Sequence, residues 1–161
     1  SLGTPLVIHQ PSYSMLNRWV EDGLTGVLRQ EGLGAIAFTP LAQGLLTDKY
    51  LSGAAADRAQ NRNSVPADRV SEHGRSLLGG LNEIARQRGQ SLAQMAIQWV
   101  LRDPVVTSAL IGASRPDQLD ENLAAIAGPA FDTEELEQID ALTDGVDLSP
   151  SGPIWADPSD S

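Results

Sequence analysis

Hydrophobic residues in this chain fall into three short continuous runs, separated by longer stretches in which they recur at helical spacing. The runs are Pro5 to His9, Gly34 to Phe38 and Val105 to Ile111. Because they are continuous rather than alternating, they predict parallel strands that are buried on both faces. Strands that alternate with helical stretches indicate βαβ units and an α/β fold with a parallel sheet.

The stretches between the runs carry signals for the ends of helices. Residues 15–30 follow the first run and are expected to be helical. An apolar stripe from Leu77 to Ala85 stops at Gly89, a residue suited to a helix C-terminus. Ser91 is suited to cap the next helix, which Asp103 and Pro104 stop.

Two further helices are expected after the third run. Leu119, Leu123 and Ile126 lie at helical spacing and predict another helix. Asp132 with Glu135 is a variant of the capping box and predicts the start of a last helix. The inward residues of that helix are expected to be Leu136, Ile139 and Leu142.

Composition limits the kind of protein. A chain of 161 residues with 41% hydrophobic residues suits one ordinary globular domain. A formal charge of −10 argues against binding nucleic acid or anionic membranes through bulk charge, so any anion site must be local. The chain has no cysteine, which excludes disulfides and thiolate chemistry and fits a reducing, cytoplasmic compartment.

The sequence shows no segment that would direct the chain to a membrane. No apolar run approaches the roughly 20 residues of a membrane span, and nothing resembles a signal peptide. The first residue is serine, so we expect a processed chain or a part of a longer protein.

The clearest candidate for an anion site follows the third run. Gly112, Ser114 and Arg115 lie between the expected strand and a helix, where free backbone N–H groups and a guanidinium can bind phosphate. Glycine allows a ligand to approach the backbone closely. The alternative is that Ser114 only caps the helix, Asp117 completes a capping box, and Arg115 is solvated.

A second candidate is the turn after the run that ends at Phe38. A proline-containing turn at the carboxyl end of a parallel strand lies where α/β proteins bind ligands. Phe38 offers an aromatic face to a flat ring, or it is a core residue. The long connection over residues 47–68 carries Lys49, Arg58 and Arg62, and such a connection is either functional or a flexible surface loop.

A third candidate follows the first run. Gln10 and Tyr13 lie just past its end, and a glutamine amide can bind a carboxamide through paired hydrogen bonds. His9 is expected to be packed and His73 to be at the surface. Neither histidine has the serine and aspartate partners of a catalytic triad.

These stretches together resemble a known family. "TPLAQGLLTDKY" and "IGASRPDQLDEN" are similar to motifs of the aldo-keto reductases. They are most similar to the branch that holds the voltage-gated potassium channel β-subunits and the bacterial glyceraldehyde 3-phosphate reductases. "GQSLAQMAIQWVLRD" and the final "IWADPSDS" add to this resemblance.

The resemblance implies a fold and a division of the chain. The family fold is a (β/α)8 TIM barrel, and the three runs correspond to strands 6, 7 and 8, the C-terminal portion. Such a barrel takes roughly 250 residues. Residues 1–144 are then the C-terminal part of the barrel and residues 145–161 a tail. We expect unpaired sheet edges that favour self-association.

The resemblance also implies NADPH as the cofactor. Gln10 would contact the nicotinamide carboxamide, and Phe38 would stack on the nicotinamide where a Tyr or Trp is common. The remaining residues would bind the pyrophosphate (Thr39, Pro40, Leu41, Ala42, Gln43, Gly44), other phosphates (Lys49, Arg58), the 2′-phosphate (Gly112, Ser114, Arg115) and the adenine (Gln118, Glu121, Asn122).

The implied function is that of a part of a reductase. The family reduces small aldehydes and ketones to alcohols. Its catalytic Asp, Tyr, Lys and His belong to the first four βα units, before any residue of this chain. Neither Tyr13 nor Tyr50 matches the motif of the catalytic tyrosine, so the chain alone is expected to be inactive. The alternative is a nucleotide-binding or interaction module that associates with itself or with another chain.

Overall fold

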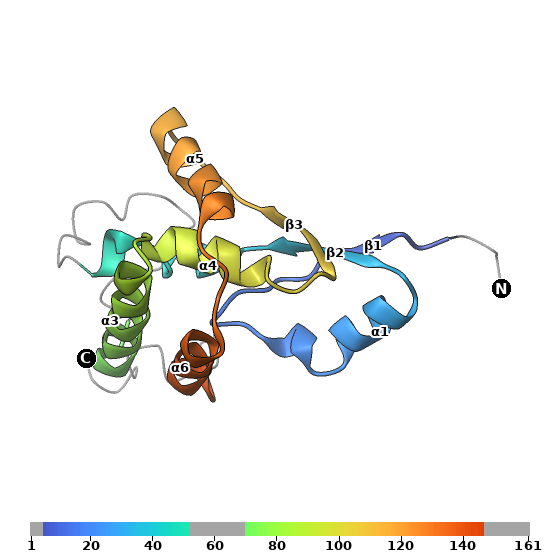
Figure 1. Ribbon diagram of the computed structural model, residues 1–161, viewed down its shortest axis with the longest axis horizontal. Coiled ribbons are helices and arrows are strands. Elements are labelled where there is room, and N and C mark those ends of the chain that lie inside the picture. The colour runs from blue at the N-terminus through green and yellow to red at the C-terminus, as the bar shows by residue number, and fades with distance from the viewer. Residues whose placement is uncertain (1–4, 52–69, 147–161) are drawn as a thin grey trace.

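The centre of the fold is a small parallel sheet. A computed structural model describes residues 5–51 and 70–146. Its three strands are β1 (Ile8–His9), β2 (Gly34–Phe38) and β3 (Val106–Leu110), paired in parallel in the order β1-β2-β3 (Figure 1). The α/β class, the parallel pairing and the strand order expected from the sequence are therefore confirmed.

Helices connect the strands and cover part of the sheet. Between β1 and β2 lie a 3-10 turn, η1 (Trp19–Glu21), and α1 (Leu24–Gln30). After β2 come the short turns η2 (Ala42–Gly44) and η3 (Asp48–Tyr50). The remaining elements are α3 (Glu72–Gln87), α4 (Leu92–Val100), α5 (Pro116–Leu123), η5 (Ala124–Ala127) and α6 (Thr133–Thr143).

The expectation of one helix over residues 15–30 is wrong. Ser14 and Asn17 instead exchange backbone hydrogen bonds of 3.1 Å, which fold this stretch into a turn. Gly23 then adopts a φ of 92° between η1 and α1 and separates the two elements. A positive φ is accessible to glycine at little cost, so this residue breaks the helical pattern.

The expectation of strands buried on both faces is also wrong. In β2 the burial alternates, with Ala35 and Ala37 buried and the intervening residues half-buried. In β3 Thr107, Ser108 and Leu110 are exposed. Apolar runs of this kind arise where both faces of a sheet are covered. In the described part of the chain, the alternation in β2 and the exposure of β3 leave one face of the sheet incompletely covered.

The helix caps follow the sequence closely. Ser91 forms a capping box with Gln94 at the start of α4, and Asp132 forms one with Glu135 at the start of α6. Gly89 has a φ of 69° just past α3. In α6 Ile139 is fully buried, and two further residues pack against the core as expected, Leu136 and Leu142.

The helix expected around Leu119 and Leu123 is present as α5, and its apolar residues point outward. Leu119, Leu123 and Ile126 are all exposed, and Ile126 keeps 71% of its accessible surface. The residues that α5 and η5 bury are Asn122 and Ala125. The apolar side of α5 therefore faces away from α4, on which this helix packs.

The core lies where α3 and α4 pack against each other. Fully buried side chains include Leu78 and Leu81 of α3 and Met95 and Trp99 of α4. None of the helices over residues 5–51 and 70–146 is both long and apolar enough to cross a bilayer.

Candidate functional site

The carboxyl ends of the three strands lie at one edge of the sheet. Phe38 and Leu110, the last residues of β2 and β3, are register partners. The chain after β1 runs beside the same end of β2, because the Phe38 N–H donates to the Pro11 carbonyl (2.9 Å) and the Tyr13 N–H donates to the Phe38 carbonyl (3.2 Å). Gln10 lies on this segment and is exposed.

The turn after β2 has an unusual backbone. Thr39, Ala42 and Gln43 have φ values of 55°, 46° and 56°, and they are the non-glycine residues with positive φ in the part of the chain that the structure describes. Gly44 follows with a φ of 92°. Non-glycine residues rarely occupy this region, and such strain clusters at functional sites.

Packing and hydrogen bonds hold this strained turn in place. Pro40 and Ala42 are buried, and Leu45 and Leu46 are anchored in the core. Backbone bonds of 2.9 Å join Ala42 to Thr39 and Gly44 to Leu41. The Thr47 hydroxyl donates to the Gly44 carbonyl at 2.6 Å. The Gln43 side chain is exposed.

The turn after β3 is open to solvent. Gly112 through Arg115 are exposed, and a Cβ added to Gly112 would meet no atom within 4 Å. No neighbour in the described structure therefore requires glycine at this position. The Ser114 backbone N–H and hydroxyl both donate to Gln118 Oε1, at 3.0 and 3.1 Å. These bonds tie the turn to the first turn of α5.

The start of α5 differs from the capping-box alternative. Arg115, not Ser114, is the N-cap residue, and it makes no side-chain cap hydrogen bond. The first-turn N–H groups therefore have no side-chain cap, which leaves them for water or for a ligand. Asp117 instead faces Arg115, whose Nε lies 3.3 Å from the carboxylate in an exposed pair. Solvent screens such a pair strongly.

One buried polar atom on α5 lacks a partner. Asn122 is 4% exposed, and its Nδ2 makes no hydrogen bond with the described residues. Buried amide groups are normally satisfied, and an exception calls for an explanation such as a ligand. The side chain of Glu121 is exposed.

Gln94 is a residue of this region that the sequence reasoning missed. Its Oε1 accepts a hydrogen bond from the Ser91 N–H at 2.9 Å, and its Nε2 donates to the Glu121 carbonyl at 3.0 Å. One side chain thus caps α4 and fixes α5 against it. The glutamine three residues after Ser91 was the available signal, because it completes a capping box.

The structure describes only some of the remaining basic residues that the sequence singled out. Lys49 lies on η3, after the strained turn, and is half-buried. Arg58 and Arg62 lie outside the described residues. His9 is half-buried in β1 and His73 is exposed at the start of α3.

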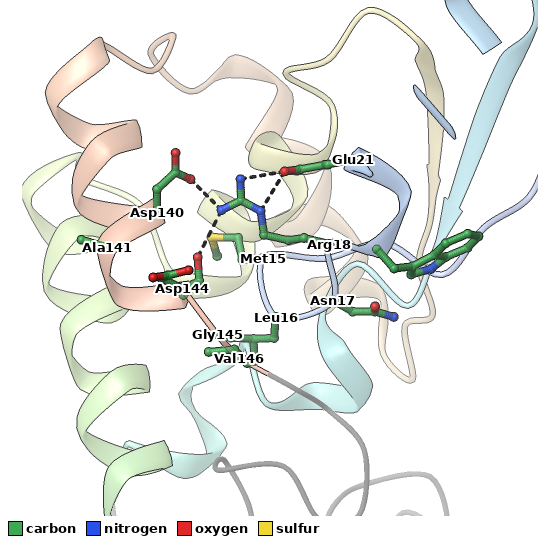
Figure 2. Close-up of a pocket in the computed structure, with 12 residues that line it drawn as sticks. Met15, Leu16, Asn17, Arg18, Glu21, Asp140, Ala141, Asp144, Gly145 and Val146 are labelled. Carbon is green, nitrogen blue, oxygen red and sulfur yellow. Dashed lines mark hydrogen bonds and ion pairs between the residues drawn. The ribbon is translucent and has the colours of Figure 1, made fainter. Parts of the chain in front are cut away.

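A separate cavity of about 750 Å³ lies between the chain after β1 and the end of α6. Figure 2 shows the Arg18 guanidinium at its wall, bonded to Glu21 at 2.7 Å and to Asp140 at 2.6 Å. Arg18 also donates to Thr143 Oγ1 at 3.3 Å. Because two carboxylates already engage this guanidinium, the cavity is poorly suited to an anion.

Tyr13 belongs to the same network and is fully buried. Its hydroxyl donates to Glu21 at 2.6 Å and accepts from Arg102 at 3.0 Å. Burial raises the pKa of Tyr13 well above its ordinary value, and the bond to Glu21 adds to this shift. The phenol therefore stays protonated and enclosed, which is unsuited to proton transfer to a substrate.

The family model described as "Aldo/keto reductase family" matches residues 1–144. The chain belongs to the aldo-keto reductase family. This confirms the family inferred from its motifs.

Two relatives show which members of this family the chain is similar to. It is 52% identical over 148 residues to the L-glyceraldehyde 3-phosphate reductase of Escherichia coli K12, covering 88% of this chain and 43% of that protein. It is 32% identical over 142 residues to a probable voltage-gated potassium channel subunit beta of Oryza sativa subsp. japonica, covering 84% and 43%. The chain thus spans less than half the length of these relatives.

Solved structures support the same fold. The aldo-keto reductase AKR11C1 from Bacillus halodurans, in its holo form, superposes with a TM-score of 0.65 at 23% identity, over 87% of this chain and 43% of that one. A thermostable aldo-keto reductase solved with the inhibitor epalrestat gives 0.62 at 27% identity, over 87% and 41%. The three-stranded sheet and its helices are therefore part of an aldo-keto reductase barrel.

Proposed function

We propose that this chain forms the cofactor-binding part of an NADPH-dependent reductase that converts small aldehydes and ketones to alcohols. The observation that carries the proposal is the strained turn from Thr39 to Gly44, which follows Phe38, the register partner of Leu110 just before the open turn at Gly112. Membership of an oxidoreductase family supports the choice of a nicotinamide cofactor. NADPH supplies a hydride when it is bound.

The residues fit a dinucleotide in chemical type. The backbone from Thr39 to Gly44 is held in an unusual conformation, and Gly112 leaves room for close approach. The uncapped start of α5 and the exposed Arg115 guanidinium suit a phosphate. The unpartnered Asn122 amide suits a ring nitrogen. We assign Gln10 and Phe38 to the nicotinamide, Gln118 and Glu121 to the adenine, and Lys49 and Arg58 to phosphates.

The chain's own residues would bind and orient the cofactor rather than move the proton. Tyr13 is enclosed by Glu21 and Arg102, and we assign no catalytic residue. The proton donor and the carbonyl-binding residues would come from the parts of the relatives that this chain does not match. We also propose a cytoplasmic location, on the absence of cysteine.

The test is a titration of the chain with NADPH and with NADH, followed by the fluorescence of the reduced nicotinamide. Arg115→Ala removes a charge-assisted phosphate contact worth about 1.5–3 kcal/mol. We therefore expect its affinity for NADPH to fall by about tenfold or more, with little change for NADH. Arg86→Ala on α3 removes an equally exposed arginine and serves as the control. Equal losses for both cofactors, or no NADPH binding by the wild-type chain, would contradict the proposal.

A further inference from the structure

The buried side of α5 is polar. Gln118 is half-buried and Asn122 is buried, and the two residues lie four positions apart on one side of the helix, while its other side chains are exposed. Figure 1 shows α5 beside α4 and apart from α3 and α6. A helix of 8 residues needs tertiary contacts to be stable. Because the buried side of α5 is polar, its position depends on hydrogen bonds.

One of these hydrogen bonds comes from the start of α4. Gln94 Nε2 donates to the Glu121 carbonyl at 3.0 Å, while Gln94 Oε1 accepts from the Ser91 N–H at 2.9 Å. Glu121 lies in the last turn of α5, where carbonyl groups lack a partner within their own helix. A single side chain therefore satisfies the first turn of one helix and the last turn of the next.

The bond from Gln94 reaches the backbone between the two residues of α5 that lie closest to the orphaned amide. The Glu121 carbonyl belongs to the peptide group that joins this residue to Asn122, so the bond fixes the orientation of that peptide plane. Asn122 Nδ2 is buried and has no hydrogen-bond partner among the described residues. We infer that Gln94 is a positioning residue for the adenosine end of the cofactor, which acts through α5 rather than by contact with the ligand. This inference rests on the proposed function.

The alternative is that Gln94 only caps α4, and two substitutions separate the two roles. Gln94→Glu keeps the cap, because glutamate also completes a capping box. An ionised carboxylate has no N–H group to donate to the Glu121 carbonyl, so the bond to α5 is lost. Ser91→Ala does the opposite. It removes the hydroxyl that accepts from the Gln94 backbone N–H at 3.3 Å and leaves both bonds of the Gln94 amide in place.

The test combines binding of NADPH and of NADH to the chain, followed by nicotinamide fluorescence, with unfolding in urea. Gln94→Glu should raise both dissociation constants by about three- to tenfold, because both cofactors carry the adenosine. Ser91→Ala should lower the urea midpoint, since a cap is lost, and leave both dissociation constants unchanged. Gln138→Glu on α6 adds the same charge and loses an exposed amide bond to Glu134. It is the matched control and should bind both cofactors like the wild type.

Hydrogen exchange of the α5 amides tests the positioning step without any cofactor. Exchange should be faster in Gln94→Glu than in the wild type and unchanged in Gln138→Glu. This readout does not depend on the proposed function, and a residue that only capped α4 would not change it.

Unchanged dissociation constants or unchanged exchange in Gln94→Glu would overturn the inference. So would an equal loss of affinity in Ser91→Ala, because the cap would then account for the effect. A loss for NADPH alone would also overturn it, since the new carboxylate would then act by repelling the 2′-phosphate. A wild-type chain that binds neither cofactor contradicts the proposed function and this inference with it. Binding by the wild type with an unaffected Gln94→Glu contradicts this inference alone.

Discussion

Arg88 is the charged residue that the described part of the chain buries, with 1% of its side chain exposed. Its guanidinium lies 3.8 Å from the centre of the Phe131 ring and bonds to Glu135 and Gln98. These contacts join the end of α3 to α4, α6 and the segment between η5 and α6. A buried charge in such a network stabilises the fold only while every partner is present.

Removing the Arg88 guanidinium is therefore expected to be severe. Arg88→Ala leaves the Glu135 carboxylate without its buried partner and should cost about 3–5 kcal/mol of unfolding free energy. Arg86 lies two residues before Arg88, and its side chain is exposed. Arg86→Ala is therefore the matched control and should lower the unfolding free energy far less. Urea unfolding measures both. A loss below about 1 kcal/mol for Arg88→Ala would show that the network is not stabilising.

Glu21 is the residue whose titration should influence stability. Burial alone would raise the pKa of Glu21, but hydrogen bonds from Arg18 and Tyr13 outweigh this and hold the pKa below its ordinary value. The ionised Glu21 carboxylate therefore stabilises the folded state at pH values above the pKa of the unfolded state, about 4.3. It is lost as the pH falls through the lower, folded-state pKa.

A pH series on Glu21→Gln tests this direction. The wild-type protein should be more stable than the variant at pH 7, and the gap between their urea midpoints should shrink as the pH falls below about 4. Glu31→Gln, an exposed carboxylate after α1, is the control and should follow the wild type. A gap that stays constant down to pH 3 would contradict the role of the Glu21 carboxylate.

At the scale of elements, the start of α6 is determined by residues that are close in sequence. Asp132 Oδ1 accepts from the Glu135 N–H at 2.8 Å, and Glu135 Oε2 accepts from the Asp132 N–H at 2.9 Å. Both bonds lie within four consecutive residues. The cap is therefore fixed by the sequence itself, independently of what packs on the helix.

The capping box can be tested with two substitutions at one position. Asp132→Ala removes the cap oxygen and should cost about 1 kcal/mol of unfolding free energy. Asp132→Asn keeps an oxygen in the same place and should remain close to the wild type. The urea midpoint at unchanged slope is the measurement. If asparagine were as damaging as alanine, the contribution of Asp132 would be its charge rather than its cap.

The difference between contacts among sequence neighbours and contacts between distant elements explains which features could be predicted from the sequence. The bounds of β2 and the caps of α4 and α6 are marked by residues that are neighbours in sequence, and they match the expectation. The burial of β3 depends on what covers it, and the expectation of burial on both faces is wrong. The sequence indicates that an apolar residue favours burial. It does not indicate which part of the structure buries that residue.

Some features of the candidate site could be predicted from the sequence, and others could not. The motifs located Gly112 and the turn that begins at Thr39, because glycine and proline mark turns directly. The positive φ of Ala42 and Gln43 could not be predicted, since neither residue type favours it. The bond from Gln94 to α5 was also beyond reach, because it joins elements that are distant in sequence.

At the scale of the whole molecule, we expect the chain alone to be inactive. General acid catalysis contributes about 10²- to 10⁴-fold, and Tyr13, the tyrosine just past β1, is enclosed by Glu21 and Arg102. Purified chain should therefore show no measurable NADPH-dependent reduction of methylglyoxal or glyceraldehyde.

The Escherichia coli reductase relative is the positive control for this assay, and the oxidation of NADPH is followed by absorbance. Turnover by the chain within about a hundredfold of the control would contradict the expectation, because that is the smaller of the losses assigned to a missing general acid. It would mean that a proton donor has been misplaced.

The strained turn at Thr39 to Gly44 has a consequence for how this protein would evolve in the laboratory. Selection for heat tolerance alone favours substitutions that relax the backbone, and glycine or asparagine at positions 42 and 43 would do so. Selection for reduction by the assembled enzyme should reject the same changes. Libraries carried through the two selections should therefore diverge first at this turn, which would reveal strain kept for function rather than by accident.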